Sequence, residues 1–241
     1  MTDWPDGVGL SRHDCIDSTN EQARRLAQSG ERGPLWIVAR EQTAGRGRRG
    51  RPWVSQAGNL FATMLLRASP WACAQLGFAA GLAVYDVIGS YANPAPVALK
   101  WPNDVLLGGK KVAGILLEAL GSDRLAIGIG INLADHPVDM EFPATSLKLM
   151  TGRAPDAEEA LLILARSMAA WYEVWRVQGF AKGLRGAWIE RAAGLHQEIR
   201  ARFDGGEMQG VFEGLDEDGA LLLRRRHGGL ERVTAADIFF R

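Results

Sequence analysis

The segment Gly45-Arg46-Gly47-Arg48-Arg49-Gly50 shows whether a Rossmann fold is to be expected. It satisfies the pattern G-x-G-x-x-G and follows the apolar run 35–39, which is typical of a strand. A Rossmann dinucleotide site also needs a helix that begins at the last glycine and an acidic residue about 20 positions further on. Pro52 opposes such a helix, and Ser69-Pro70-Trp71 stands where the acid is needed. The sequence therefore disfavours a Rossmann fold.

The same segment is suited to binding an anion. Its glycines let backbone N–H groups approach an anion closely, and its arginines can form bidentate hydrogen bonds to phosphate or carboxylate. Nothing apolar holds these charges in place, so we expect the loop to be mobile when empty and ordered when filled. Trp53 is close enough in sequence to stack on a base. A small-anion site, an RNA contact and a solvated basic loop all remain open on composition alone.

Composition indicates a globular protein. The 241 residues can form a domain of about 150–200 residues and a smaller one. Hydrophobic residues make up 47%, which excludes disorder along the whole chain. Lys+Arg and Asp+Glu both count 28, so the net charge is zero and non-specific coating of nucleic acid is not expected.

Several features predict a cytoplasmic location. Cys15 and Cys73 have no metal-type spacing and are too few for a disulfide framework, which fits a reducing compartment. The N-terminus has no basic and apolar regions of a signal peptide. The longest charge-free stretch, 71–85, is shorter than the roughly 20 residues of a membrane span. We interpret it as a buried helix and expect no membrane association.

The order of elements predicts an α+β fold. Ser18 and Glu21 form a capping box for a helix that runs to about Gln28, and Asp156 caps a later helix with an apolar stripe. A further long helix begins near Ser69-Pro70. Strands are predicted at 35–39, 59–67, 97–101, 105–107, 111–119 and 125–133, with Gly108-Gly109 as a hairpin turn.

The predicted secondary structure changes at Gly194. From there the chain has only short strands (198–203, 208–214, 220–226 and 230–233) and tight turns. Four or five short strands in about 45 residues are typical of a small β-barrel. We therefore predict a first domain at 1–193 and a small β domain at 194–241.

Four other segments carry polar groups that suit a binding site. Lys100-Trp101-Pro102-Asn103-Asp104 offers a cation and a carboxylate at a turn, and Asp104 could form a salt bridge with Lys111 across the predicted hairpin. Lys111 lies at the start of a strand in which Gly114 leaves room beside the backbone. Gly128 and Gly130 precede Asn132, which can donate to and accept from an adenine edge. Ser18-Thr19-Asn20 lies at a helix N-terminus that can receive a carbonyl. Taken singly, each also has an ordinary structural explanation, as a turn, an exposed hairpin lysine, close packing or a helix cap.

Covalent catalysis by a side chain is not indicated. The four histidines, His13, His136, His196 and His227, are scattered, and no pair has the spacing of metal ligands. No Cys–His or Ser–His–Asp arrangement is suggested.

In this order the motifs resemble the biotin protein ligase family, over essentially the whole chain. The motifs that carry the resemblance are Asp17-Ser18-Thr19-Asn20, Gln42-Thr43-Ala44-Gly45-Arg46-Gly47-Arg48-Arg49-Gly50-Arg51-Pro52-Trp53, Lys100-Trp101-Pro102-Asn103-Asp104, Lys111-Val112-Ala113-Gly114-Ile115-Leu116-Leu117-Glu118 and Gly128-Ile129-Gly130-Ile131-Asn132. The resemblance implies a mixed, largely antiparallel sheet flanked by helices and a small C-terminal SH3-like β-barrel.

The resemblance also implies a two-step reaction. The biotin carboxylate attacks the α-phosphate of ATP to give biotinyl-5′-AMP and pyrophosphate. A lysine amine of a biotin carboxyl carrier protein domain then attacks this anhydride and releases AMP. Cations must offset the repulsion between a carboxylate and a triphosphate, which matches the arginines, Lys111 and an expected Mg²⁺ that arrives with ATP. No protein-only metal cluster is expected.

Residue roles follow from the same resemblance. Lys111, Arg48 and Asp104 are implied to be catalytic, with Asp104 orienting Lys111 or the incoming lysine. The implied biotin site comprises Ser18, Thr19, Asn20, Gln42, Arg46, Gly47, Arg48, Lys111 and Gly114. The implied nucleotide site comprises Arg48, Arg49, Arg51, Trp53, Asn103, Lys111 and Asn132. Loop 45–51 would fold over the intermediate and exclude water.

Some members of the family carry an N-terminal DNA-binding domain that represses transcription. Only 17 residues precede Ser18, so we expect a ligase without repressor function and no DNA partner. A homodimer is possible in the family. The alternatives are a lipoate–protein ligase or octanoyltransferase of the same superfamily, and a non-catalytic RNA-binding module with an arginine loop.

Overall fold

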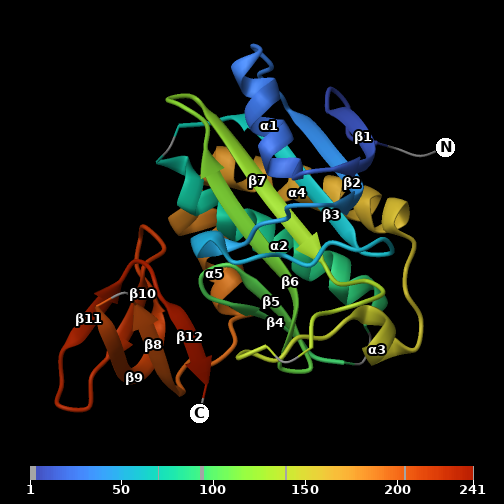
Figure 1. Ribbon diagram of the computed structural model, residues 1–241. Helices are drawn as coiled ribbons and strands as arrows, with labels where there is room; N and C mark the ends of the chain where they lie inside the picture. The colour runs from blue at the N-terminus through green and yellow to red at the C-terminus, as the bar shows by residue number, and fades with distance from the viewer. Residues whose placement is uncertain (1–3, 70, 93–94, 139, 204, 241) are drawn as a thin grey trace.

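The computed structural model describes residues 4–69, 71–92, 95–138, 140–203 and 205–240. Its larger sheet has seven strands in the order β1-β2-β3-β7-β6-β5-β4 (Figure 1). β1 and β2 pair in parallel and every other pair is antiparallel, so the predicted mixed, largely antiparallel sheet is confirmed. The strands are β1 (Gly9–Ile16), β2 (Leu35–Gln42), β3 (Leu60–Arg67), β4 (Val97–Lys100), β5 (Asp104–Leu107), β6 (Lys110–Ala119) and β7 (Arg124–Ile131).

Helices cover both faces of this sheet (Figure 1). One face carries α1 (Thr19–Gln28), and the other carries α2 (Ala72–Tyr91) and α4 (Ala157–Gly179). The shorter helical segments are η1 (Arg48–Gly50), α3 (Leu147–Thr151), η2 (Phe180–Leu184) and α5 (Arg185–Ile189).

The predicted cap of α1 is confirmed in one half only. The Ser18 hydroxyl accepts a hydrogen bond from the Glu21 N–H at 3.5 Å. In a capping box the Glu21 carboxylate would return to the Ser18 N–H, but that N–H donates to Asp17 and the Glu21 carboxylate accepts from Arg46. The first turn of α1 is therefore tied to the arginine loop.

The charge-free stretch belongs to a core helix. The structure begins α2 at Ala72, and Pro70 lies outside the described residues. By length and composition α2 is apolar enough to cross a membrane, but 72% of its 18-residue apolar stretch is buried within the fold. Its small residues allow close packing, as at Gly77, where an added Cβ would lie 2.8 Å from Leu117 of β6.

Residues after Gly194 form a five-stranded antiparallel sheet in the order β11-β10-β9-β8-β12. Its strands are β8 (Glu198–Phe203), β9 (Gly206–Leu215), β10 (Leu221–Arg224), β11 (Leu230–Val233) and β12 (Asp237–Phe240). The predicted small β domain is confirmed as an antiparallel sheet, and its barrel is not closed, because no pairing joins β11 to β12 among the described residues. Asp204, placed by us in the first turn, lies outside those residues.

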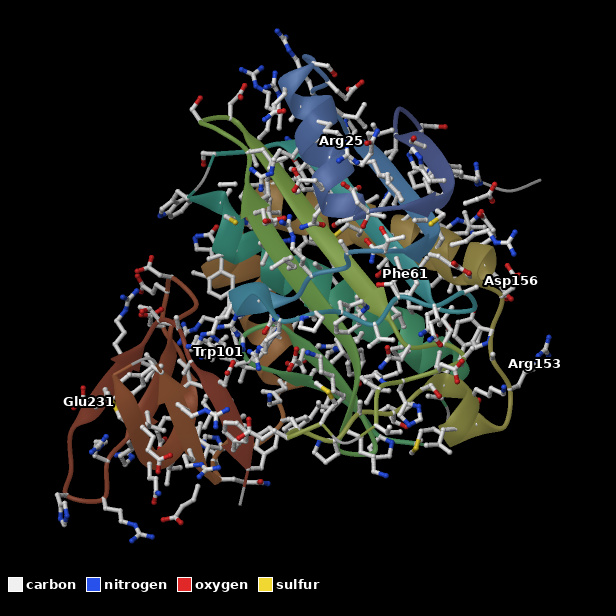
Figure 2. The ribbon with its side chains drawn as sticks, in the orientation of Figure 1. Arg25, Phe61, Trp101, Arg153, Asp156 and Glu231 are labelled. Atoms are coloured by element: carbon white, nitrogen blue, oxygen red, sulfur yellow. The ribbon has the colours of Figure 1, made fainter. Side chains whose placement is uncertain are left out.

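The C-terminal sheet packs against the rest of the fold through an aromatic contact (Figure 2). The Trp101 indole Nε1 donates to the Gly219 carbonyl at 3.0 Å. Gly219 has φ +90°, and a Cβ there would lie 2.5 Å from the Phe78 ring of α2. Glycine is therefore required at this contact. In the same arrangement Asp237 of β12 lies 3.1 Å from Arg51, in the loop that follows β2.

Candidate functional site

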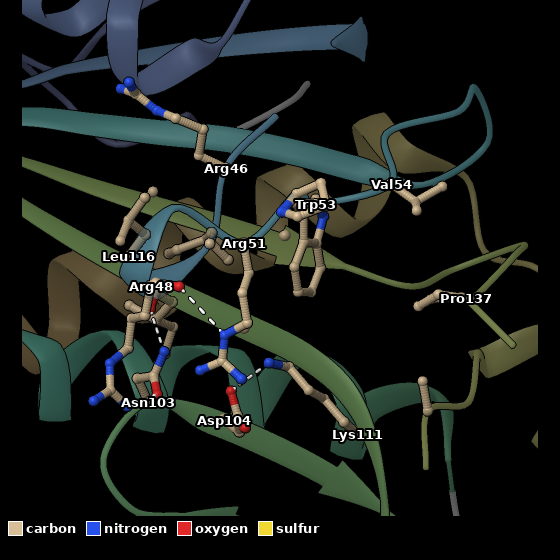
Figure 3. Close-up of a pocket in the computed structure, with 18 of the residues that line it drawn as sticks. Arg46, Arg48, Arg51, Trp53, Val54, Asn103, Asp104, Lys111, Leu116 and Pro137 are labelled. Atoms are coloured by element: carbon tan, nitrogen blue, oxygen red, sulfur yellow. Dashed lines mark hydrogen bonds and ion pairs between the residues drawn. The ribbon is translucent and has the colours of Figure 1, made fainter. Parts of the chain in front are cut away.

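A cavity of about 390 Å³ opens between α1, the loop that follows β2, the inner face of β6 and β7, and β12. All the predicted site residues except Arg49 line it (Figure 3). The predicted residues at the cavity are Ser18, Thr19, Asn20, Gln42, Arg46, Gly47, Arg48, Arg51, Trp53, Asn103, Asp104, Lys111, Gly114 and Asn132.

One end of the cavity is a network of amides and hydroxyls that is tied to one carboxylate, Glu118. Gln42 Oε1 accepts from both the N–H (2.8 Å) and the hydroxyl (3.1 Å) of Thr19. Thr63, from β3, lies within hydrogen-bond distance of the Thr19 hydroxyl (2.8 Å) and of Asn20 Oδ1 (2.6 Å). Asn20 Nδ2 donates to Glu118 at 2.7 Å. These contacts fix the directions of the amides and hydroxyls, so this end is preorganised for a neutral ligand with N–H and C=O groups.

The floor of the cavity is a pair of glycines under an indole ring. Gly114 of β6 and Gly130 of β7 are directly paired in the sheet. A Cβ at Gly130 would lie 2.5 Å from the Trp53 ring, and one at Gly114 would lie 2.9 Å from it. The room beside the backbone at Gly114 and Gly130 thus accommodates Trp53. Gly128 is required for a different neighbour, because a Cβ there would clash with Asn20.

A buried carboxylate and two lysines form the centre of the site. Asp104 Oδ1 lies 2.6 Å from Lys111 Nζ, which confirms the predicted bridge across the β5–β6 hairpin. Asp104 Oδ2 lies 3.4 Å from Lys100 Nζ, and the Lys100 ammonium also lies 4.1 Å from the Phe142 ring centroid. Burial opposes ionisation of Asp104, but the two ammonium charges outweigh it and hold its pKa below the ordinary value. Burial lowers the pKa of Lys100, against the attraction of Asp104.

Arg48 is held at the wall of the cavity by Asn103. The Asn103 Oδ1 accepts from Arg48 Nη1 at 3.0 Å, and its Nδ2 donates to the Ile115 carbonyl of β6 at 2.7 Å (Figure 3). Burial lowers the pKa of Arg48 from its ordinary value, and the nearby Asp237 opposes that change. A half-buried guanidinium fixed by a neutral amide keeps its charge available to an anion.

The arginine loop has more partners than its sequence indicates. Gly47 N–H donates to the Arg51 carbonyl at 2.7 Å, and Arg46 forms an ion pair with Glu21 at 2.9 Å. Asp237 of β12 lies 3.3 Å from Arg49 and 3.1 Å from Arg51. Carboxylates from α1 and β12 therefore contact this loop without a bound anion, although nothing apolar was expected to hold it. That the loop is mobile when empty and ordered when filled stays a prediction.

Some predicted residues are committed to structural contacts. Asn132 Nδ2 donates to the Thr145 carbonyl at 3.0 Å, and the residue also lines the cavity. Arg49 is not among the residues that line the cavity, and it lies 3.3 Å from Asp237.

Sequence analysis did not assign Thr63, Lys100, Asp237 and the aromatic residues Phe61, Phe142 and Phe239 to the site. Lys100 belongs to a segment that we singled out, so a signal existed for it. Asp237 contacts Arg51 across 186 positions of sequence, and no local pattern indicates that meeting.

Fold and site together define a class of ligase. A model described as the biotin/lipoate A/B protein ligase family matches residues 13–133, half of the chain, and one described as the biotin protein ligase C terminal domain matches residues 194–241. The structure resembles a biotin protein ligase from Aquifex aeolicus in complex with biotin and ATP, with a TM-score of 0.85 and 30% identity over 97% of this chain and 99% of that one.

Two proteins of similar sequence indicate which kind of ligase this class contains. The biotin–[acetyl-CoA-carboxylase] ligase of Paracoccus denitrificans is 48% identical over 236 residues, which cover 93% of this chain and 97% of that protein. The bifunctional ligase/repressor BirA of Bacillus subtilis is 34% identical, over 96% of this chain and 74% of that protein. The chain belongs to the biotin protein ligase family.

Proposed function

We propose that this protein is an ATP-dependent biotin–protein ligase that biotinylates a lysine of a biotin carboxyl carrier protein domain. The observation that carries the proposal is the cavity, which joins a neutral polar end to a wall of arginine and lysine side chains. A neutral ring at one end and a carboxylate facing a triphosphate at the other is the charge pattern of biotin beside ATP. The Paracoccus relative's name and the biotin–ATP complex of the Aquifex enzyme support the same assignment.

In the first step, a biotin carboxylate oxygen attacks the α-phosphorus of ATP. The new P–O bond gives biotinyl-5′-AMP, and the bond to the β-phosphate breaks to release pyrophosphate. Arg48 and Lys111 are the catalytic cations that reduce the repulsion between the two anions. Asp104 positions Lys111, which is supported by their 2.6 Å contact. No protein nucleophile is needed, because the substrate carboxylate is itself the nucleophile.

The polar end binds the ureido ring of biotin. Ser18, Thr19, Asn20 and Gln42 supply its polar groups, together with the backbone at Arg46 and Gly47. We assign Gly114 to the same site, where its lack of a side chain lets the Trp53 ring lie against β6. The ureido ring carries two N–H donors and one carbonyl acceptor, so it satisfies both kinds of group at that end. Phe61 and Ile129 contribute the apolar wall that a hydrocarbon chain requires.

The nucleotide lies toward Trp53 and the arginine loop. The Trp53 ring lines the cavity and lies against Gly114 and Gly130, a position in which it can pack beside an adenine ring. Asn132 offers its Oδ1 to the adenine amino group. Asn103 holds Arg48 at the phosphates, and Arg49 and Arg51 meet the triphosphate from the rim. Loop 45–51 then covers the intermediate and excludes water.

Mg²⁺ is expected to accompany the nucleotide, whose phosphate oxygens would hold it and whose charge it would offset. The described residues contain no group of three or more His, Cys, Asp or Glu side chains that could hold a metal ion.

In the second step, the acceptor lysine amine attacks the acyl carbon of biotinyl-5′-AMP. An amide bond forms, the C–O bond to phosphate breaks, and AMP leaves while the amine loses a proton to solvent. The acceptor is the biotin carboxyl carrier protein domain of a carboxylase, which is supported by the acetyl-CoA carboxylase in the name of the Paracoccus relative.

The organisation of the chain is part of the proposal. We assign residues 1–193 to the catalytic domain and 194–241 to the C-terminal domain. We further propose a cytoplasmic ligase that acts without a DNA partner. The zero net charge and the match to 97% of a relative named as a ligase alone support this. Among the described residues β1 lies at one edge of the larger sheet, which supports a homodimer as part of the proposal.

ATP–pyrophosphate exchange tests the proposal. Exchange is measured with biotin, lipoate, octanoate or no acid, and we expect it with biotin only. Exchange with lipoate or octanoate instead would assign the protein to the sister ligases. Absence of exchange with every acid, in protein that is folded by circular dichroism, would exclude adenylate formation.

A further inference from the structure

One carboxylate from the C-terminal sheet meets three arginines of the loop. Asp237, the first residue of β12, lies 3.1 Å from Arg51, 3.3 Å from Arg49 and 3.9 Å from Arg48. Its side chain is only 13% exposed, whereas that of Arg51 is 54% exposed. The contact joins the loop to the C-terminal sheet, and 186 positions of sequence separate Arg51 from Asp237.

One carboxylate serves more than one guanidinium group here. Asp237 carries a single negative charge and, besides Arg49, faces Arg48 and Arg51, while the carboxylate of Asp104 contacts Lys111 and Lys100. Guanidinium groups form paired hydrogen bonds with carboxylate and phosphate oxygens alike. An anion with more oxygens and more charge than a carboxylate is therefore a better partner for this group of arginines.

The backbone of the loop is strained at the same place. Arg49 has φ +56° and ψ +29°, a left-handed conformation that side chains other than glycine rarely adopt. Such conformations persist only where surrounding contacts hold them. The ion pair of Arg49 with Asp237 is such a contact, and its loss would let the loop relax.

We propose that Asp237 is a positioning residue that occupies the polyphosphate site of the empty enzyme. Its carboxylate holds Arg48, Arg49 and Arg51 in the place that the triphosphate of the nucleotide takes, and the nucleotide displaces it. This inference rests on the proposed ATP-dependent function. The C-terminal sheet thereby keeps the loop ordered before substrate arrives, and the nucleotide releases that hold as it binds.

The test compares Asp237→Asn with wild type and with Glu213→Gln. Glu213 is a control of the same kind, because it forms an ion pair with Arg224 on the same sheet away from the loop. Binding of inorganic tripolyphosphate is measured by calorimetry, and cleavage of loop 45–51 by trypsin is followed in the unliganded protein. We expect D237N to bind tripolyphosphate roughly fivefold more tightly, the size of a partly exposed ion pair, and to be cleaved faster. E213Q and the conservative variant D237E should behave as wild type.

The kinetic readout separates displacement from a merely structural role. D237N should have a lower KM for ATP in biotin-dependent exchange with kcat unchanged within about twofold. Weaker tripolyphosphate binding by D237N, or unchanged binding and cleavage, would overturn the inference. If wild type supports biotin-dependent exchange in those cases, the proposed function stands and only the role of Asp237 is lost. If wild type neither binds tripolyphosphate nor supports exchange, both fail.

Discussion

Lys111 and Lys110 are neighbours on β6 with different surroundings. Lys111 lines the cavity and contacts Asp104, whereas Lys110 is exposed. We predict that Lys111→Ala lowers the rate of biotinyl-adenylate formation by about a hundredfold or more, because a cation facing the reacting anions is lost. Lys110→Ala is the matched control and should retain the wild-type rate. Wild-type turnover by K111A in a single-turnover assay would remove the role assigned to Lys111.

Asp17 provides a prediction on pH. The Arg25 guanidinium donates two hydrogen bonds of 2.7 Å to its carboxylate and lowers its pKa to about 2, against a small opposing effect of burial. The native pKa is below the unfolded one, so this contact stabilises the fold above about pH 4 and is lost as the pH falls toward 2.

We therefore expect Asp17→Asn to lower the free energy of unfolding at pH 7 by about 0.5 to 1 kcal/mol, a value limited by solvent screening. The difference from wild type should disappear near pH 2. Urea unfolding at the two pH values measures it, with Asp14→Asn as control, since Asp14 is 95% exposed and 3.9 Å from its partner Arg40. An equal difference at both pH values would contradict the assignment.

At the scale of secondary-structure elements, the paired strands β6 and β7 form the floor for Trp53. We predict that Gly130→Ala displaces the Trp53 ring, since the added Cβ would lie 2.5 Å from it, and weakens ATP binding by roughly tenfold. Gly89→Ala is the control, because an added Cβ there meets nothing within 4 Å and alanine favours the helix by about 0.5 to 1 kcal/mol. Unchanged ATP affinity in G130A, measured by calorimetry, would show that Trp53 does not contact the nucleotide.

Elements with a local signal were predictable. The α1 helix begins after Ser18 and ends at Gln28, and Asp156 caps α4 by accepting from the N–H groups of Glu158 and Glu159, as expected. β1 was missed because it is an edge strand whose side chains are mostly polar and partly exposed, so it shows no apolar alternation. β12 was missed because four residues at the end of a chain carry too little pattern.

Site residues were likewise predictable only where a local motif indicated them. The arginine–glycine loop and the Asp104–Lys111 pair follow from motifs whose chemistry is local. Thr63 and Asp237 could not be assigned, because each acts through a partner that only the folded sheet brings near.

At the scale of the whole molecule, the two sheets form one core. Trp101 is 3% exposed and donates to Gly219 of the C-terminal sheet. We predict that Trp101→Phe lowers the free energy of unfolding by about 1 to 3 kcal/mol, because a buried carbonyl loses its donor. The control is Trp71→Phe, which changes a side chain that is 70% exposed and should have an effect within about 0.5 kcal/mol.

Unfolding of both variants is followed by circular dichroism and by tryptophan fluorescence. A shared core predicts coincident single transitions for the two probes. Two separated transitions in wild type would show that the C-terminal sheet unfolds independently of the rest.

The central claim is that this cavity activates biotin for transfer to a carrier lysine. The most direct measurement incubates the protein with biotin, ATP, Mg²⁺ and a biotin carboxyl carrier protein domain, and follows the acceptor's mass. We predict that the acceptor gains one biotinyl group only when biotin and ATP are both present, and that AMP is released. An acceptor whose target lysine is replaced by arginine should gain nothing. No mass change on the intact acceptor, with wild-type protein that is folded and binds biotin, would contradict the account.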